Sequence, residues 1–387
     1  MVPLRYNVRS LMVRKVTTLA TAIGIALVVF VFAGAGMLKE GVNAAMVSSA
    51  RSDTVIVLRK GSDAELASSL TNDQINLLRG HSAVATGAPG GGVIPEVVLV
   101  MTPEVADGSG ISNVAVRGMS ADGYKFRPEF KITQGRAPTP GTNEVVVGKG
   151  INGRFKNISV GKTFEMRRNR PLVVVGEFEA GGSSYEAEVW GDLDAISAAA
   201  GRKSAASSAR VRLTNPSAFD GYRAAIEADK RMNLKVMRED EYYEKQAGQT
   251  RDFLGFIGKL FAALFSFAAM IGAAITMNGA VAHRTKEIGT LRALGFSKLA
   301  ILFSFLFEAI LLSLIGAVLG LVLVQLLSLF TFRTMNFQTF SEIVIHFKTS
   351  PAVIGGALFF SVLMGLIGGL VPAIRAALVS PIEAMRG

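Results

Sequence analysis

Four long apolar stretches constrain this sequence more than any other feature. They occupy residues 16–38, 260–282, 299–332 and 349–374. Each is long enough to supply the roughly 20 apolar residues with which a helix crosses a bilayer core about 30 Å thick. Glu308 is the one carboxylate within them. The sequence therefore predicts an α-helical membrane protein with four transmembrane helices.

The basic residues are concentrated beside these stretches. Residues 1–15 carry four basic and no acidic residues, and residues 283–298 carry four basic residues against one acidic residue. Residues 39–250 are nearly balanced, with 27 basic and 25 acidic residues. Lys and Arg mark cytoplasmic loops, so we expect both termini and residues 283–298 in the cytoplasm of a bacterium and residues 39–250 outside its inner membrane. The basic residues beside the apolar stretches then account for most of the net charge of +11, so this charge does not indicate binding of nucleic acid.

The segment at residues 39–250 has the pattern of an α+β domain. Val- and Ile-rich runs alternate with Gly, Pro, Asn and Asp, which is typical of strands and turns. Two β-α-β halves are predicted, one at each end of the segment, and together they can form one split α/β sandwich. Their elements are strands at 53–58 and 97–101 around a helix at 71–79, and strands at 209–213 and 234–237 around a helix from about 216 to 230. Residues 130–195 are expected to form an inserted, mostly β subdomain.

These patterns divide the chain into consecutive segments. A helix that starts near Glu239 and continues to His283 would join the outer domain stiffly to the second span. The first apolar stretch is too long for the core of a signal peptide, so we interpret it as a retained anchor. The predicted segments are an amphipathic cytoplasmic helix at 1–15, spans at 16–38, 251–282, 299–332 and 351–374, the outer domain at 39–250, a cytoplasmic coupling helix at 283–298, an outer loop at 333–350 and a cytoplasmic tail at 375–387.

The short basic segment at residues 283–298 is the strongest candidate for a functional site. It lies between two spans, so a partner that pushes on it would move both. Apolar side chains recur in it at helical spacing, and charged side chains surround them. An ordinary solvated loop is the alternative interpretation. The candidate residues are Arg284, Lys286, Glu287, Ile288, Leu291, Arg292 and Leu294.

Motifs for catalysis are missing from the sequence. The triplet Gly161-Lys162-Thr163 lacks the preceding glycine of a phosphate-binding loop, because Lys156 stands at that position. The sequence has no cysteine, and its three histidines are widely separated. We therefore expect no catalytic residue, no metal site and no cofactor bound by this chain.

Placing the carboxyl group of Glu308 inside a membrane costs free energy, so the residue needs a role there. We favour a role in helix packing over proton transfer. Two G-x-x-x-G pairs, Gly316 with Gly320 and Gly365 with Gly369, would let helices approach closely.

Three stretches resemble the MacB/FtsX-type permeases of ABC transporters, the type VII or mechanotransmission family. They are RTKEIGTLRALGFSK at 284–298, FLFEAILLSLIGAVLG at 305–320 and PAIRAALVSPIEAMRG at 372–387. Residues 174–194 are similar to the outer domain of MacB-like members. The layout is that of a four-span MacB-like member without a fused ATPase.

The resemblance implies a dimer with a second copy or a paralogue. It further implies a separate cytoplasmic ATPase that binds ATP and contacts residues 284–298 and, in a cell with an outer membrane, a periplasmic adaptor. The expected function is ATP-driven export or extraction of a substrate. Two alternatives stay open: a permease that releases lipoproteins, as in LolC/LolE-like proteins, and an FtsX-like transmitter of signals to a cell-wall hydrolase.

Overall fold

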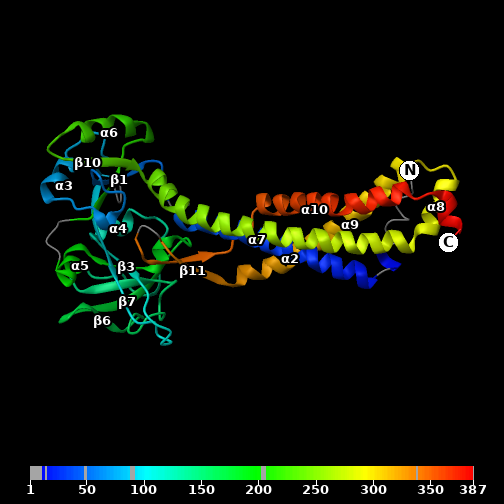
Figure 1. The fold of residues 1–387 in the computed structure, drawn as a ribbon. Coiled ribbons are helices and arrows are strands. Elements are labelled where there is room, and N and C mark those ends of the chain that lie inside the picture. The colour runs from blue at the N-terminus through cyan, green and yellow to red at the C-terminus, as the bar shows by residue number, and fades with distance from the viewer. Residues whose placement is uncertain are drawn as a thin grey trace. The chain divides into compact units, whose positions relative to one another are not determined.

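The computed structural model describes residues 11–13, 15–47, 50–87, 92–201, 206–336 and 339–386. It divides into two compact units (Figure 1). A helical unit comprises Met1–Glu40, Asp252–Phe330 and Phe347–Gly387, and an α+β unit comprises Gly41–Arg251 and Thr331–His346. Most of the amphipathic helix predicted at residues 1–15 lies outside the described residues.

Four helices in the described part of the chain are long and apolar enough to cross a membrane. They are α2 (Lys15–Met46), α7 (Glu239–His283), α9 (Lys298–Gln325), which continues into the 3-10 turn η4 (Leu326–Leu329), and α10 (Pro351–Leu378). Two short helices, α8 (Thr285–Ala293) and α11 (Pro381–Arg386), also belong to the helical unit. The predicted fold class, four spanning helices with a large α+β domain, is confirmed.

Both glycine pairs lie where two of these helices touch. Gly316 and Gly320 of α9 face α2, where a Cβ atom at Gly320 would lie 2.6 Å from the carbonyl oxygen of Ala26. Gly365 and Gly369 of α10 face α9, where a Cβ atom at Gly365 would lie 2.9 Å from the carbonyl oxygen of Ala309. A side chain at these positions would push the helices apart, so the small residues set how closely the helices approach.

One mixed sheet forms the framework of the α+β unit. Its order is β10-β1-β9-β2-β3-β8-β5-β7-β4, and β6 pairs with β7. The β3/β8 and β5/β7 pairs are parallel, and the other pairs are antiparallel. The strands are β1 (Thr54–Arg59), β2 (Val93–Met101), β3 (Val114–Met119), β4 (Phe130–Gly135), β5 (Glu144–Gly148), β6 (Thr163–Arg167), β7 (Arg170–Ala180), β8 (Glu188–Asp192), β9 (Ser208–Arg212) and β10 (Leu234–Arg238).

The two predicted β-α-β halves interleave at one end of this sheet. β1 and β2 belong to the first half, β9 and β10 to the second, and their order is β10-β1-β9-β2. The strands from residues 130–195, where we expected an inserted subdomain, continue the same sheet beyond β3. Short helical elements connect the strands: η1 (Glu65–Ala67), α3 (Asn72–Arg79), α4 (Ala121–Lys125), η2 (Ser184–Ala187), α5 (Leu193–Ala200), η3 (Pro216–Ala218) and α6 (Phe219–Ala228).

Local signals account for the helices of both halves. The Thr71 hydroxyl accepts a hydrogen bond from the Gln74 N–H while the Gln74 side chain accepts one from the Thr71 N–H, so a capping box begins α3. The Asn215 side chain accepts from the Ala218 N–H and begins the turn that leads into α6.

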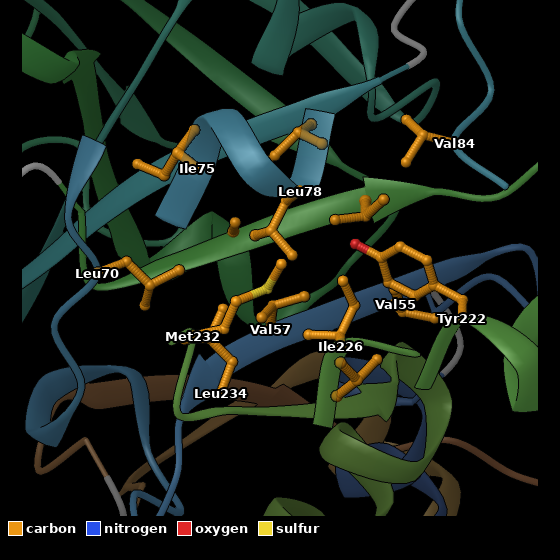
Figure 2. Close-up of a cluster of buried hydrophobic side chains, with 14 of the residues drawn as sticks. Val55, Val57, Leu70, Ile75, Leu78, Val84, Tyr222, Ile226, Met232 and Leu234 are labelled. Atoms are coloured by element: carbon orange, nitrogen blue, oxygen red, sulfur yellow. The ribbon is translucent and has the colours of Figure 1, made fainter. Parts of the chain in front are cut away.

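Alternate residues of β1 belong to two hydrophobic cores. Val55 and Val57 pack with side chains of α3 and α6, as Figure 2 shows. Ile56 and Leu58 belong to a second core that contains Trp190. Successive side chains of a strand point to opposite faces, so burial on both faces explains the uninterrupted apolar run in β1. A third core includes Val116 of β3, Val147 of β5 and Val189 of β8.

A hairpin occupies the region predicted as an outer loop at residues 333–350. Strands β11 (Thr331–Met335) and β12 (Glu342–His346) pair antiparallel and belong to the α+β unit. The Glu342 N–H donates to the Asn113 carbonyl at 2.8 Å, and Val344 packs into the core around β3 and β8. Residues between the third and fourth spans therefore build part of the outer domain.

Candidate coupling site

The candidate coupling segment forms a short helix with a defined start and end. At Arg284 the backbone leaves the α7 geometry, and α8 then runs from Thr285 to Ala293. Gly295 has φ +95°, and the N–H of Phe296 donates to the Leu291 carbonyl at 3.2 Å. This Schellman arrangement ends α8 because glycine adopts the left-handed backbone conformation without strain. Ser297 then accepts a hydrogen bond from the Ala300 N–H and begins α9.

One face of α8 is packed inside the helical unit. Ile288 is fully covered by side chains of α7, α9 and α10, and Leu291 packs at the margin of the same cluster. Gly289 lies against α11, where a Cβ atom would come within 2.5 Å of the Ala384 Cβ atom. Arg292 is half-buried and donates to the Phe296 carbonyl at 3.1 Å. Ile288, Leu291 and Arg292 therefore hold α8 in place.

The opposite face of α8 is open to solvent. Lys286 and Glu287 are exposed, and Leu294 keeps 73% of its surface accessible. Helical spacing predicts Leu294 on the same apolar face as Ile288 and Leu291. It lies beyond the end of the helix, where the turn at Gly295 takes the chain away from that face. An exposed leucine between charged residues is suited to contact a partner.

Arg284 and Glu308 form an ion pair at the junction of α7 and α8. The Arg284 Nη1 atom donates to Glu308 Oε2 at 2.9 Å, and both side chains are about 5% exposed. Arg284 also reaches Glu287 at 3.3 Å and lies over the Phe305 ring. The predicted exposed position of Arg284 is therefore wrong, because its guanidinium is buried against the third span. The pair gives Glu308 a structural partner and ties the junction to α9.

A second cluster of charges, which we name the sheet cluster, lies buried in the α+β unit. The Glu96 carboxylate accepts hydrogen bonds from Arg127 at 2.6 Å, from Arg117 at 2.7 Å and from Arg210 at 3.3 Å. These four side chains are at most 7% exposed. Buried charges persist only when they are paired and hydrogen-bonded. The remaining acidic members are Glu65, Glu188 and Glu239.

The sheet cluster includes the first turn of α7. Glu239, the first residue of that helix, accepts a hydrogen bond from Arg210 Nε at 2.8 Å. Tyr243, one turn later, accepts from Arg210 Nη2 at 2.7 Å and is hydrogen-bonded to Tyr185. The Trp190 Nε1 atom donates to Glu188 at 2.7 Å. Ionic and hydrogen-bond contacts therefore anchor the start of α7 to the sheet.

Burial and the neighbouring arginines shift the pKa values of the acids of the sheet cluster in opposite directions. Burial by itself would raise the pKa of the Glu96 carboxyl, but the three arginines outweigh it and hold that pKa below its usual range. The pKa of Glu65 is lowered in the same way, against its own desolvation, by Arg117 and Arg210. Desolvation dominates at Glu239 and raises its pKa. The two acids with lowered pKa, Glu96 and Glu65, each accept hydrogen bonds from more than one arginine, whereas Glu239 accepts from a single guanidinium.

Two family models match this chain. The model of the MacB-like periplasmic core domain matches residues 16–229, and that of the FtsX-like permease C-terminal region matches residues 259–381. The chain belongs to the MacB/FtsX family of ABC transporter permeases. The α+β unit of this permease is accordingly a periplasmic core domain, and α7 to α10 form its FtsX-like part.

Individual relatives agree with this assignment. The ABC transporter permease YvrN of Bacillus subtilis is 40% identical over 106 residues, which are 27% of this chain and 24% of YvrN. The macrolide export ATP-binding/permease protein MacB of Neisseria gonorrhoeae is 25% identical over 98% of this chain and 60% of its own length. The chain thus spans less than two thirds of the curated relatives that it matches.

Among solved structures, the periplasmic region of MacB from Actinobacillus actinomycetemcomitans aligns with a TM-score of 0.38 and 15% identity. That alignment covers 51% of this chain and 94% of the solved chain.

None of the residues of the sheet cluster is predicted as a site residue from the sequence. A signal was present, since Glu96 and Arg117 each interrupt an otherwise apolar strand, and Arg210 stands between Ala209 and Val211 in β9. A charge at such a position requires a partner. The partners come from segments distant in the sequence of the permease, so the strand pattern alone could not identify them.

Proposed function

We propose that this permease transmits force between a cytoplasmic ABC ATPase and its own periplasmic core domain. ATP would be bound by the partner and not by this chain, whose sequence has no nucleotide-binding motif. Closure of the ATPases would move α8, and α7 would carry the displacement to the sheet. The work done there would export or extract a substrate. In this arrangement both termini and α8 lie in the cytoplasm.

The continuity of α7 is the observation that supports this proposal most strongly. The helix has 45 residues without a break, which corresponds to a length of about 68 Å. Its first turn is held by Arg210 in the sheet cluster, and its end is held by the Arg284–Glu308 pair. A helix fixed at both ends is suited to carry a displacement along its axis.

The exposed face of α8 provides the direct test. Leu294→Asp and Lys286→Glu change exposed side chains that take no part in the Arg284–Glu308 ion pair, so they should weaken binding of the ATPase without unfolding the permease. Leu77→Asp is the matched control, because Leu77 is an exposed leucine of the periplasmic core domain. Co-purification with the ATPase encoded beside this permease measures the effect. Unchanged recovery of the ATPase with both α8 variants would contradict the proposal.

The packing of α7 supports a dimer. Only 17% of the apolar window of α7 is buried, compared with 33–44% in the other three spans. Its exposed aromatic side chains include Phe253, Phe256, Phe261 and Phe267. A second copy or a paralogue would cover part of this surface, and lipid would cover the rest. Crosslinking between single cysteines at Phe256 would test this, since the natural sequence has no cysteine.

The physiological output has three candidates within this mechanism. A periplasmic adaptor that works with the permease would indicate export. Crosslinks between the core domain and lipidated proteins would indicate lipoprotein release. Binding of a cell-wall hydrolase without substrate-stimulated ATPase activity would indicate signalling. We favour export or extraction, because MacB of Neisseria gonorrhoeae, a macrolide export protein by name, matches along 98% of this chain.

A further inference from the structure

A groove with a volume of about 420 Å³ opens beside the β11–β12 hairpin of the periplasmic core domain. One side is the loop between β2 and β3, and the other side is the hairpin itself. The residues that line the groove include Ile111, Ser112, Arg154, Arg333, Met335, Phe340 and Glu342.

Large apolar side chains stand exposed at this groove. Ile111 is 69% exposed, Phe340 is 56% exposed and Met335 is 42% exposed. They come from two segments that are distant in the sequence, so the fold brings them together. Exposed apolar groups gathered around a groove with polar residues are typical of binding surfaces, and aromatic residues often dominate the affinity there.

The backbone holds Phe340 outward at a cost. Its φ is +54°, a conformation that bulky residues avoid. The Phe340 N–H donates to the Asn336 carbonyl at 2.8 Å, and the Phe340 carbonyl accepts from Asn113 Nδ2 at 2.8 Å. A hydrogen bond between Thr339 and Ser341 further fixes the turn. Since the ring gains little packing within the chain, this strain indicates a function for it.

The charged residues that line the groove are two arginines and one glutamate. Arg154 donates to Glu342 at 2.9 and 3.2 Å, and Arg333 Nε lies 3.3 Å from the same carboxylate. Ser112 also donates to Glu342. Two guanidinium groups thus share one carboxylate. The Arg333 side chain is 38% exposed, and its two terminal nitrogens donate no hydrogen bond within the described residues.

We propose that this groove binds a peptide segment of a periplasmic partner protein, in which an apolar side chain stands next to a carboxylate. The carboxylate would pair with the terminal nitrogens of Arg333, a geometry that guanidinium groups favour. The apolar side chain would pack between Phe340, Met335 and Ile111. An extended segment fits an open groove, and β11 pairs only with β12 in the described part of the chain, which leaves an edge that can accept a strand. The proposal rests on the periplasmic location given above.

A binding measurement on the full chain in lipid nanodiscs tests this proposal. The probes are fluorescein-labelled octapeptides that each contain one Phe, Leu or Ile next to one Glu, and matched peptides with Gln in place of Glu. We expect at least one acidic peptide to bind ten times more tightly than its amide counterpart by fluorescence anisotropy. Arg333→Gln should abolish that preference, and Phe340→Asn should weaken binding at least fivefold. Asn tolerates a positive φ, so this variant removes the ring and keeps the turn.

Matched controls separate the groove from the general surface. Arg223→Gln removes an arginine of similar exposure that also pairs with one glutamate, and it should leave binding unchanged. Equal affinity for acidic and amide peptides, or equal losses in Arg223→Gln and Arg333→Gln, would overturn the proposal. Efficient disulfide dimers of the Phe340→Cys variant in membranes would also overturn it, because the occupant would then be a second copy. In nanodiscs the groove is accessible whichever side of the membrane it occupies. Peptide binding can therefore fail or succeed independently of the co-purification test of the ATPase.

Discussion

Glu96→Gln should strongly destabilise the periplasmic core domain. The carboxylate is fully buried and accepts hydrogen bonds from three arginines. The amide keeps the size of the side chain but removes its charge, which leaves the buried Arg127 guanidinium without the carboxylate that it pairs with. Removing one partner of a buried ion pair costs about 3 to 5 kcal/mol. With a slope of about 2 to 3 kcal/mol per molar urea, the unfolding midpoint should fall by about 1 to 2.5 M.

Tryptophan fluorescence during urea unfolding is the assay for this change. Trp190 is the only tryptophan of the chain, it is fully buried and it donates to Glu188 within the sheet cluster. Its emission therefore reports unfolding of the core domain in the full-length protein. Glu104→Gln is the control, since that carboxylate is 63% exposed and pairs with Lys156, and its midpoint should not move measurably.

A double-mutant cycle with Arg127 tests whether the loss comes from charge. Arg127 makes its ion pair with Glu96, so Arg127→Gln combined with Glu96→Gln should cost less than the two single changes added together. The reasoning would be refuted if Glu96→Gln moved the midpoint by less than about 0.3 M. Strict additivity in the cycle would refute it as well.

Three further outcomes are expected. Arg284→Ala should lower the melting temperature of the detergent-solubilised protein more than Glu308→Gln does, because it leaves a buried carboxylate without its arginine; equal shifts would contradict this. Gly320→Leu should lower the melting temperature by separating α9 from α2, whereas Gly279→Leu, where a Cβ atom meets nothing within 4 Å, should not. Since the pKa of Glu96 is lowered in the folded state, its stabilisation is present above about pH 4.3, its unfolded value, and is lost as the pH falls toward the folded value. Urea midpoints at pH 7 and pH 4 should therefore differ less in Glu96→Gln than in the natural chain.

The sequence by itself determined the elements whose signals are local. An uninterrupted apolar run must become a spanning helix because lipid offers no partner for its backbone polar groups, and four such runs gave the four spans. The capping residue Thr71 and the apolar run of β1 likewise defined the first β-α-β half, and the capping residue Asn215 marked the helix of the second. The end of α8 is also set by a local signal, the glycine at position 295.

Only the tertiary structure decided which charges meet. Arg284 and Glu308 are separated by 24 positions, and Glu96 and Arg210 by 114, so no helical or strand period relates them. The same is true of Arg333, whose hairpin became part of the core domain instead of a simple loop. Helical periodicity also placed Leu294 on the wrong face, because a chain that leaves its helix no longer follows that period. Local patterns fix which segments are helices and strands, but pairing between distant charges depends on the packing that brings them together.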